Sequence, residues 1–471
     1  MTLLGLELSD AGIIAADGST AKLLEVDGHE LESPGYAIPE KMRLLVGKPA
    51  ADKAHLFPLE VINRFWDQLG TEPLEQKNRH AQNYAEIACA HLSLIWENVK
   101  LHGDEMVIAV PDYYGREQLG LILGMAQELS IPVKGFVPLP IAASFNPYPN
   151  AMLLHLDIHL HRFEIVYLHQ GDHLTRENSA ASPDISLNLL YRRWVESIAE
   201  EFVHTTRFDP LHQAQTEQEL YDRLPVALEI LKSHSSFIFE ISHGKHSYRI
   251  TLLKDLLKQK SMAMYNEVCR FIENIRHEQG KDDSLTVLQL SHRIARLPGL
   301  IDKLSGIGNC EIVELEPGAG ALGVLRLGRQ LLGQHSKNGV SFFTSRPWQQ
   351  PESQPARSVS QKTPVKMRAT HLLYRDLAFP ISDKPLTIGR GDYPDGKCIS
   401  IQAQASGVSK KHCTVQRNAD MIVLMDYSHQ GTFVEGQRVD GNFVLELGQT
   451  IRLGTSGETI RLIACMNTDE T

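Results

Sequence analysis

Up to residue 333, short apolar runs alternate with amphipathic segments along the chain. The run 106–110 is apolar throughout and is closed by Pro111, which predicts a buried strand. Residues 115–130 then carry apolar side chains at helical spacing. The same reasoning predicts strands at 133–137 and 285–290, a strand or hairpin at 151–168, and helices at 187–202 and from 296 onward. No internal repeat is visible, and the alternation predicts an α/β fold for residues 1–333.

From residue 366 the pattern changes to short alternating strands separated by Gly, Asp and Asn, which predicts an all-β sandwich over 366–471. The intervening segment 334–365 is rich in Gln, Ser and Pro and is predicted to be a linker. Its apolar points, 340–343 and Trp348, could dock on a neighbouring domain. The strands expected in the sandwich include 386–388, 413–416, 422–425 and 450–453. The fold class is therefore multidomain, an α/β body followed by a sandwich.

The charge distribution restricts the classes of partner. The net charge is −10, and the whole acidic excess precedes residue 366, where 45 acidic residues face 35 basic ones. Neither part offers a basic face for nucleic acid or for an anionic membrane, so protein partners are expected. The six scattered cysteines include no Cys-x-x-Cys pair, and the acidic Glu7 and Asp10 interrupt the apolar amino terminus. Both features favour a cytoplasmic protein without a secretory signal.

Three short motifs in the sandwich carry candidate chemistry: Gly389-Arg390, Ser409-Lys410-Lys411-His412 and Gln430-Gly431-Thr432. A phosphothreonine dianion is best bound by a fixed cation together with neutral donors that converge on its oxygens. Arg390, Ser409 and Lys410 have this chemistry. Loops at one end of a rigid sandwich can bring such residues together.

These motifs, in this order, resemble the forkhead-associated (FHA) domain family over about 367–466. The resemblance implies phosphothreonine-peptide binding, with Gln430 standing where the family usually has the Asn that holds the peptide backbone. Glu435 likewise replaces the Asn often found before the next glycine, Gly436. The alternative is a sandwich of this family that has lost phosphate binding. In the implied roles, Arg390 and Ser409 bind phosphate, Lys410 assists, Gly389 and His412 support the loops, and Thr432 anchors the loop that Gly431 lets turn.

The N-terminal part resembles the DnaK-type heat-shock chaperones of the actin-like ATPase superfamily over nearly all of residues 1–333. It has no counterpart of the chaperone's peptide-binding domain. The resemblance implies an actin-like fold with two phosphate-binding hairpins. The segments that carry it are 107–114, 124–133 and 140–144, the hairpin positions 3–10 and 153–164, the adenosine-side segment 287–304 and the closing helix from 317.

The similarity fails where nucleotide chemistry takes place, because the glycines that let backbone N–H groups approach phosphate are replaced. Glu7 and Asp157 remain at the positions where the family places water and Mg²⁺. We therefore expect a pseudo-ATPase without a cofactor, with nucleotide binding or weak ATPase activity as alternatives. The replacements are Ser9 and Asp10-Ala11 in the first hairpin, His159-Leu160-His161 in the second, and His292-Arg293 on the adenosine side.

A metal site is the alternative interpretation of the segment 155–161. His155, Asp157, His159 and His161 share a parity, so a continuous strand would direct all four to one face, where they could ligate zinc. The chaperone resemblance implies a turn within this stretch, which would separate them. No metal site is therefore expected.

Together these features predict an adaptor that reads threonine phosphorylation by a Ser/Thr kinase, with a second protein partner on the N-terminal body. Two other functions stay open. One is an active chaperone-type ATPase that the FHA-like domain targets to its site of action. The other is an actin-like protein that forms filaments.

Overall fold

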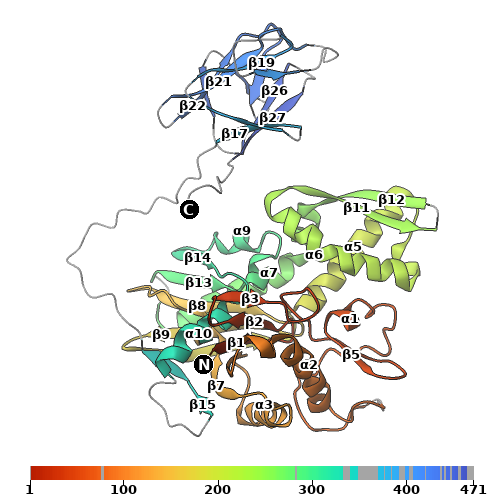
Figure 1. Cartoon of the computed structure of the whole chain (residues 1–471), viewed down its shortest axis with the longest axis vertical. Coiled ribbons are helices and arrows are strands. Elements are labelled where there is room, and N and C mark those ends of the chain that lie inside the picture. The colour runs from red at the N-terminus through yellow and green to blue at the C-terminus, as the bar shows by residue number, and fades with distance from the viewer. Residues whose placement is uncertain are drawn as a thin grey trace. The chain divides into compact units, whose positions relative to one another are not determined.

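The structure of the chain is a computed structural model that divides into two compact units, Met1–Glu352 and Ser353–Thr471 (Figure 1). Each unit is described by itself. The structure describes residues 2–75, 79–244, 246–281, 284–331, 340–347, 370–375, 377–382, 384–391, 398–401, 407–418, 421–434, 437–439, 442–445, 448–454 and 458–463.

The first unit contains a six-stranded sheet in the order β15-β7-β6-β1-β2-β3. Strands β1, β2 and β3 are antiparallel neighbours, whereas β1, β6, β7 and β15 run parallel. Both faces of β6 are buried, which explains its uninterrupted apolar run. The strands are β1 (Leu3–Glu7), β2 (Ile14–Asp17), β3 (Lys22–Leu24), β6 (Glu105–Val110), β7 (Val133–Pro138) and β15 (Ser341–Phe342).

A second six-stranded sheet of the same unit has the order β14-β13-β8-β9-β10-β16. Here β8, β9 and β10 are antiparallel neighbours, and β8, β13 and β14 run parallel. The expected strand or hairpin at 151–168 is thus a hairpin of β8 and β9 with its turn at 159–162. The strands are β8 (Met152–Ile158), β9 (Phe163–Gln170), β10 (His173–Ser182), β13 (Thr286–Leu290), β14 (Cys310–Glu314) and β16 (Ser345–Pro347).

The two sheets repeat one plan of connections. Each begins with three antiparallel strands, adds a fourth strand parallel to its first, and places a fifth beyond the fourth. The repeat was not visible in the sequence, because the segments between corresponding strands differ in length and content. Helix α2 leads into β6, whereas three helices and a separate hairpin lead into β13.

Helices cover the outer faces of the sheets and join them in the middle. The remaining elements of the unit are α1 (Lys48–Ala51), α2 (Tyr84–Val99), η1 (Lys100–His102), α3 (Arg116–Glu128), α4 (Leu139–Ala143), α5 (Leu187–Thr206), η2 (Pro210–His212), α6 (Ala214–Ser233), α7 (Lys254–Glu278), α8 (His292–Ala295), α9 (Leu300–Leu304) and α10 (Ala319–Leu331), with the hairpins β4 (Ala37–Pro39) with β5 (Leu44–Val46) and β11 (Ser236–His243) with β12 (His246–Leu253).

Three apolar clusters hold the first unit together. One packs α2 and α3 on the first sheet, a second packs α5, α6 and α7 on the second sheet, and a third joins both sheets through α4 and α10. Helix α10 approaches β1 and α4 backbone to backbone. A Cβ on Gly5 would lie 2.1 Å from the Ala321 carbonyl oxygen, and one on Gly323 would lie 1.9 Å from that of Ala142. These glycines therefore set the spacing of the central layer.

The structure corrects part of the predicted linker 334–365. Residues 341–347 contribute β15 and β16, which extend the two sheets by pairing with β7 and β10. The Phe343 ring is buried against Gly135, where an added Cβ would lie 2.8 Å from the ring. Apolar burial and backbone pairing therefore overcome the polar composition of this stretch. Trp348 and the rest of the linker lie outside the described residues.

The second unit is a β-sandwich of two sheets in the orders β18-β17-β27-β26-β23-β24 and β20-β19-β21-β22-β25 (Figure 1). Alternate residues of both sheets form one apolar core, for example Leu386, Ile388 and Val415 from one sheet and Ile451 and Leu462 from the other. The strands are β17 (His371–Tyr374), β18 (Leu377–Pro380), β19 (Leu386–Gly389), β20 (Cys398–Ser400), β21 (Cys413–Asn418), β22 (Met421–Asp426), β23 (Thr432–Val434), β24 (Gln437–Arg438), β25 (Asn442–Leu445), β26 (Thr450–Leu453) and β27 (Thr459–Ile463).

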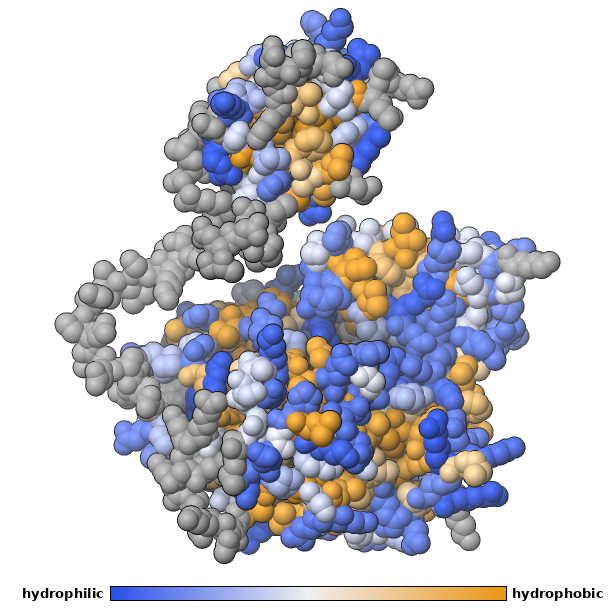
Figure 2. All heavy atoms as spheres, in the orientation of Figure 1, coloured by the Kyte–Doolittle hydropathy of each residue, from blue (hydrophilic) through white to orange (hydrophobic). Residues whose placement is uncertain are grey.

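The visible surface of both units combines polar and apolar side chains. Figure 2 shows that hydrophilic side chains cover much of the visible face of each unit, with apolar side chains in separate patches. No helix in the described part of the chain is long and apolar enough to cross a bilayer.

Candidate functional site

The sandwich brings the first two motifs together by backbone pairing. Strand β19 ends at Gly389, and the next amide, of Arg390, donates a hydrogen bond to the Ser409 carbonyl oxygen at 3.1 Å. The Gly391 amide donates to the Lys410 carbonyl oxygen at 3.0 Å. A Cβ on Gly389 would lie only 2.0 Å from that oxygen, so glycine is required for the approach. Residues from two distant loops are thereby placed side by side.

His412 supports the same loops from inside the fold. It is fully buried, its Nδ1 accepts a hydrogen bond from the Ser409 amide at 3.0 Å, and its Nε2 lies 3.3 Å from the Gly431 carbonyl oxygen. A nitrogen facing a carbonyl must donate, so the ring is the neutral tautomer with its proton on Nε2. Burial lowers the pKa of His412, in agreement with this assignment. One uncharged ring thus ties the Ser409 loop to the Gly431 loop.

The third motif is fixed by Asp426 at the end of β22. Its Oδ1 accepts hydrogen bonds from the Ser428 amide at 3.0 Å and from the buried Thr432 hydroxyl at 2.8 Å. The His429 amide lies 3.3 Å from the Ser409 hydroxyl oxygen, to which it donates. The motifs had not marked Asp426 as a site residue, although an acidic residue at the start of such a turn is a usual anchor. Asp426 therefore fixes the loop 427–431, which carries the third motif, at both of its ends.

The groups expected to contact phosphate remain accessible at this end of the sandwich. Arg390 and Lys410 are exposed, and no carboxylate of a described residue forms an ion pair with either. The Lys411 ammonium lies 4.0 Å from the centroid of the Tyr427 ring. Gln430 is exposed, and its amide oxygen lies where a Cβ on Gly407 would come within 2.5 Å. Arg390, Lys410 and Gln430 thus lie on loops that are bonded to Ser409 or adjoin it in sequence.

Comparison with known families agrees with this geometry. Residues 386–454 match the family model of the FHA domain, a range that contains every residue of the site described above. The second unit therefore contains an FHA domain. FHA domains bind phosphothreonine-containing proteins, so the match implies phosphothreonine-dependent protein binding by this chain. No curated protein matches the chain.

In the first unit, the two hairpin turns expected at a nucleotide site face each other and are bonded directly. The Ser9 hydroxyl oxygen lies 2.9 Å from Nδ1 of His159, and the Leu160 amide donates to Oδ1 of Asp10 at 2.9 Å. Burial alone would lower the pKa of His159, but Asp157 and Asp10, with Glu164, raise it to about 10. The imidazolium is therefore a fixed internal cation of this junction.

Arg293 supplies a second internal cation between the sheets. Its side chain is 4% exposed, and its Nη1 lies 3.4 Å from Oε1 of Glu7 and 3.8 Å from Oδ2 of Asp157. Glu32, from the segment after β3, contacts the same guanidinium at 2.7 Å. Burial would raise the pKa of Asp157, but His159 and Arg293 lower it. The positive charge of Arg293 thus lies beside Glu7 and Asp157, the two acids expected near Mg²⁺.

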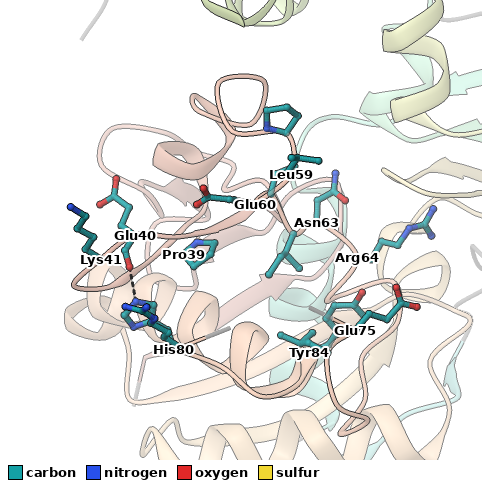
Figure 3. Close-up of a pocket in the computed structure, with 15 residues that line it drawn as sticks. Pro39, Glu40, Lys41, Leu59, Glu60, Asn63, Arg64, Glu75, His80 and Tyr84 are labelled. Carbon is teal, nitrogen blue, oxygen red and sulfur yellow. Dashed lines mark hydrogen bonds between the residues drawn. The ribbon is translucent and has the colours of Figure 1, made fainter. Parts of the chain in front are cut away.

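The cavity volumes agree with the occupation of this junction by the chain's own side chains. A cavity of about 80 Å³ remains beside Arg293, lined also by Glu32, Tyr191 and Arg296. Ligand sites for small molecules usually span about 300–1,000 Å³. A cavity of about 780 Å³ lies elsewhere, among residues of 39–84 that include Pro39, Leu59, Asn63 and Tyr84 (Figure 3). That cavity borders the second hairpin turn, since Nε2 of His161 lies 3.0 Å from the carbonyl oxygen of Asn63, but its lining includes no residue of either turn.

The metal-site alternative finds no geometric support in the described residues. Strand β8 ends at Ile158, so His159 and His161 lie in the turn, and the four residues of 155–161 do not share one face. Within the described ranges no group of three or more His, Cys, Asp or Glu side chains is arranged to hold a metal ion.

Proposed function

We propose that the protein is an adaptor that binds a threonine-phosphorylated partner through Arg390, Ser409 and Lys410. The observation that carries this proposal is the pairing of the Arg390 and Ser409 backbones within the segment that matches the FHA domain. The pairing places Arg390 and Ser409 next to each other along the backbone, and their side chains supply the charged and the neutral donor that a phosphate needs. Gln430, Gly431 and Thr432 belong to the adjacent loop, which would hold the peptide backbone.

The first unit acts in this proposal as a scaffold with an actin-like, DnaK-related fold and without ATPase activity. The repeated strand order of its two sheets supports such a fold. The Arg293 guanidinium supports the loss of activity, because it lies between Glu7 and Asp157, where a metal-bound phosphate would have to enter. The scaffold would offer its surface to a second protein, and a Ser/Thr kinase would control recruitment of the first.

The test is capture of partners from host lysate by the full chain and by its Arg390→Ala variant, each before and after phosphatase treatment. We expect a partner that only the wild-type chain captures, and only from untreated lysate. Capture in all four conditions would assign the function to the first unit. Arg390 is exposed, so the substitution leaves the core of the sandwich intact.

An active ATPase is the competing proposal, and a titration with Mg-ATP distinguishes the two. Because His159 and Arg293 neutralise the buried acids, we expect neither saturable binding at micromolar ATP nor turnover. Micromolar affinity together with steady phosphate release would overturn the scaffold proposal for the first unit. It would leave phosphopeptide recognition by the second unit unaffected.

A further inference from the structure

A strap of residues 27–36, between β3 and β4, passes over the junction of the two sheets and is anchored at several points. Ser33 and Ile13 exchange backbone hydrogen bonds of 3.0 and 2.8 Å. The Ser33 hydroxyl donates to Oδ2 of Asp27 at 2.7 Å and lies 2.8 Å from Nε2 of the buried His91. The Gly35 amide donates to the Asp10 carbonyl oxygen at 3.1 Å. The strap is therefore a fixed part of the first unit.

Glu32 is the residue of the strap that reaches into the junction. Its Oε1 accepts two hydrogen bonds from Arg293, at 2.7 Å from Nη2 and at 3.0 Å from Nε, and its Oε2 lies 3.6 Å from Nε2 of His292. Arg293 also donates to the Gly12 carbonyl oxygen at 3.1 Å. Hydrogen bonds from a guanidinium to a carboxylate or phosphate oxygen are charge-assisted and strong, so Glu32 fills a position that suits an oxyanion.

Gly12 makes room for this carboxylate. A Cβ at position 12 would lie 2.3 Å from Cγ and 2.5 Å from Oε1 of Glu32. Glycine at position 12 therefore allows the Glu32 side chain to approach the backbone this closely. Glu32 belongs to the segment after the first sheet, and Arg293 belongs to the helix after β13 of the second, so their pairing bridges the two sheets.

We propose that Glu32 is a built-in ligand, whose carboxylate occupies an oxyanion-binding site formed by Arg293, His292 and Gly12 and so holds the two sheets together. The site takes a carboxylate or a phosphate monoester, and in the native chain the strap supplies it. The two sheets are then joined at this junction without a bound nucleotide. This inference deepens the scaffold role proposed for the first unit and is independent of phosphopeptide binding by the second.

The test uses the full chain with Glu32→Ala and follows thermal unfolding by tryptophan fluorescence. All four tryptophans precede residue 353, so the signal reports the first unit alone. We expect the melting temperature to fall by about 5 °C or more, because the buried Arg293 loses the carboxylate that lies closest to it among its three acidic partners. Glu30→Ala is the matched control, since Glu30 is an exposed acid of the same strap, and it should change the melting temperature little.

Rescue by added anions tests the binding site itself. Acetate or inorganic phosphate, at ionic strength matched with chloride, should restore at least half of the melting temperature lost in Glu32→Ala. Neither anion should stabilise the wild-type chain or the double variant Glu32→Ala with Arg293→Met. Rescue by only one of the two anions would identify which oxyanion the site prefers. Equal stabilisation of all three proteins would place the anions elsewhere and overturn the proposal.

Two further variants keep the test decisive if Glu32→Ala does not fold. Glu32→Gln preserves the volume and removes the charge, so it should lower the melting temperature by a smaller amount. Gly12→Ala should mimic the loss, because its Cβ displaces the Glu32 side chain, and added anions should not rescue it. Wild-type stability in both variants would show that the carboxylate is not a ligand.

Discussion

The substitution Arg293→Met tests whether an internal cation holds the first unit together. Methionine keeps most of the length and volume of the side chain but removes the guanidinium. The three carboxylates that now contact it, those of Glu7, Asp157 and Glu32, would then face one another at the junction without their shared counterion. We therefore expect a large loss of stability from a single change.

The magnitude follows from burial. Removing one partner from a buried ion pair costs about 3–5 kcal/mol, a large share of the roughly 5–15 kcal/mol that stabilises a typical domain. Arg296→Met is the matched control on the same segment. The Arg296 side chain is 41% exposed, and its nearest carboxylate, that of Glu229, is 3.9 Å away and 60% exposed. Exposed pairs of this kind contribute about 0–1 kcal/mol.

Equilibrium unfolding in urea, followed by tryptophan fluorescence, measures both variants. With a urea dependence of about 3 kcal/mol/M or more for a unit of this size, Arg293→Met should lower the midpoint by roughly 1 M. Arg296→Met should leave the midpoint within about 0.3 M of the wild type. An Arg293→Met protein as stable as its control would refute the assignment of Arg293 as the central counterion.

Three other predictions concern the loops and the pH dependence. Gly389→Ala forces a Cβ against the Lys410 carbonyl oxygen, so phosphopeptide affinity should fall at least about tenfold in a fluorescence anisotropy titration. His412→Ala removes the bond to the Ser409 amide and should lower the temperature at which the chain releases a bound phosphothreonine peptide, followed by fluorescence anisotropy. His159 has a pKa raised to about 10 in the fold, so its stabilisation is complete below its ordinary pKa of about 6.5 and is lost as the pH rises through 10. Urea midpoints of the first unit should therefore fall between pH 7 and 10, and His159→Gln should flatten that slope; equal slopes would contradict the assignment.

The sequence predicted the elements whose patterns are local. The apolar run 106–110, the helix at 115–130 and the hairpin within 151–168 all occur, with ends shifted by a few residues. The motifs around Arg390 and Ser409 could be placed on loops because each directly follows or precedes a short apolar strand. Periodicity over a few residues is sufficient for such inferences.

Features that depend on distant pairing were not predicted. Strands β15 and β16 are two and three residues long, too short for an alternating pattern to distinguish them from a linker. The bond between Glu32 and Arg293 joins residues 261 positions apart. In the sequence, Arg293 indicated only that a glycine of the chaperone-like adenosine-side segment is replaced. No sequence pattern marked Glu32. The ion pair between them is shown only by the fold, which places the strap of residues 27–36 over the junction of the two sheets.

Binding of phosphothreonine peptides tests the central claim most directly. The full chain would be titrated against a degenerate library of fluorescent peptides with a fixed central phosphothreonine, and against matched libraries with threonine or phosphoserine. We predict saturable binding of the phosphothreonine library alone and a loss of at least about tenfold in affinity for Arg390→Ala, since charge-assisted hydrogen bonds contribute about 1.5–3 kcal/mol. Equal binding of the three libraries, or undiminished affinity of Arg390→Ala, would contradict the account.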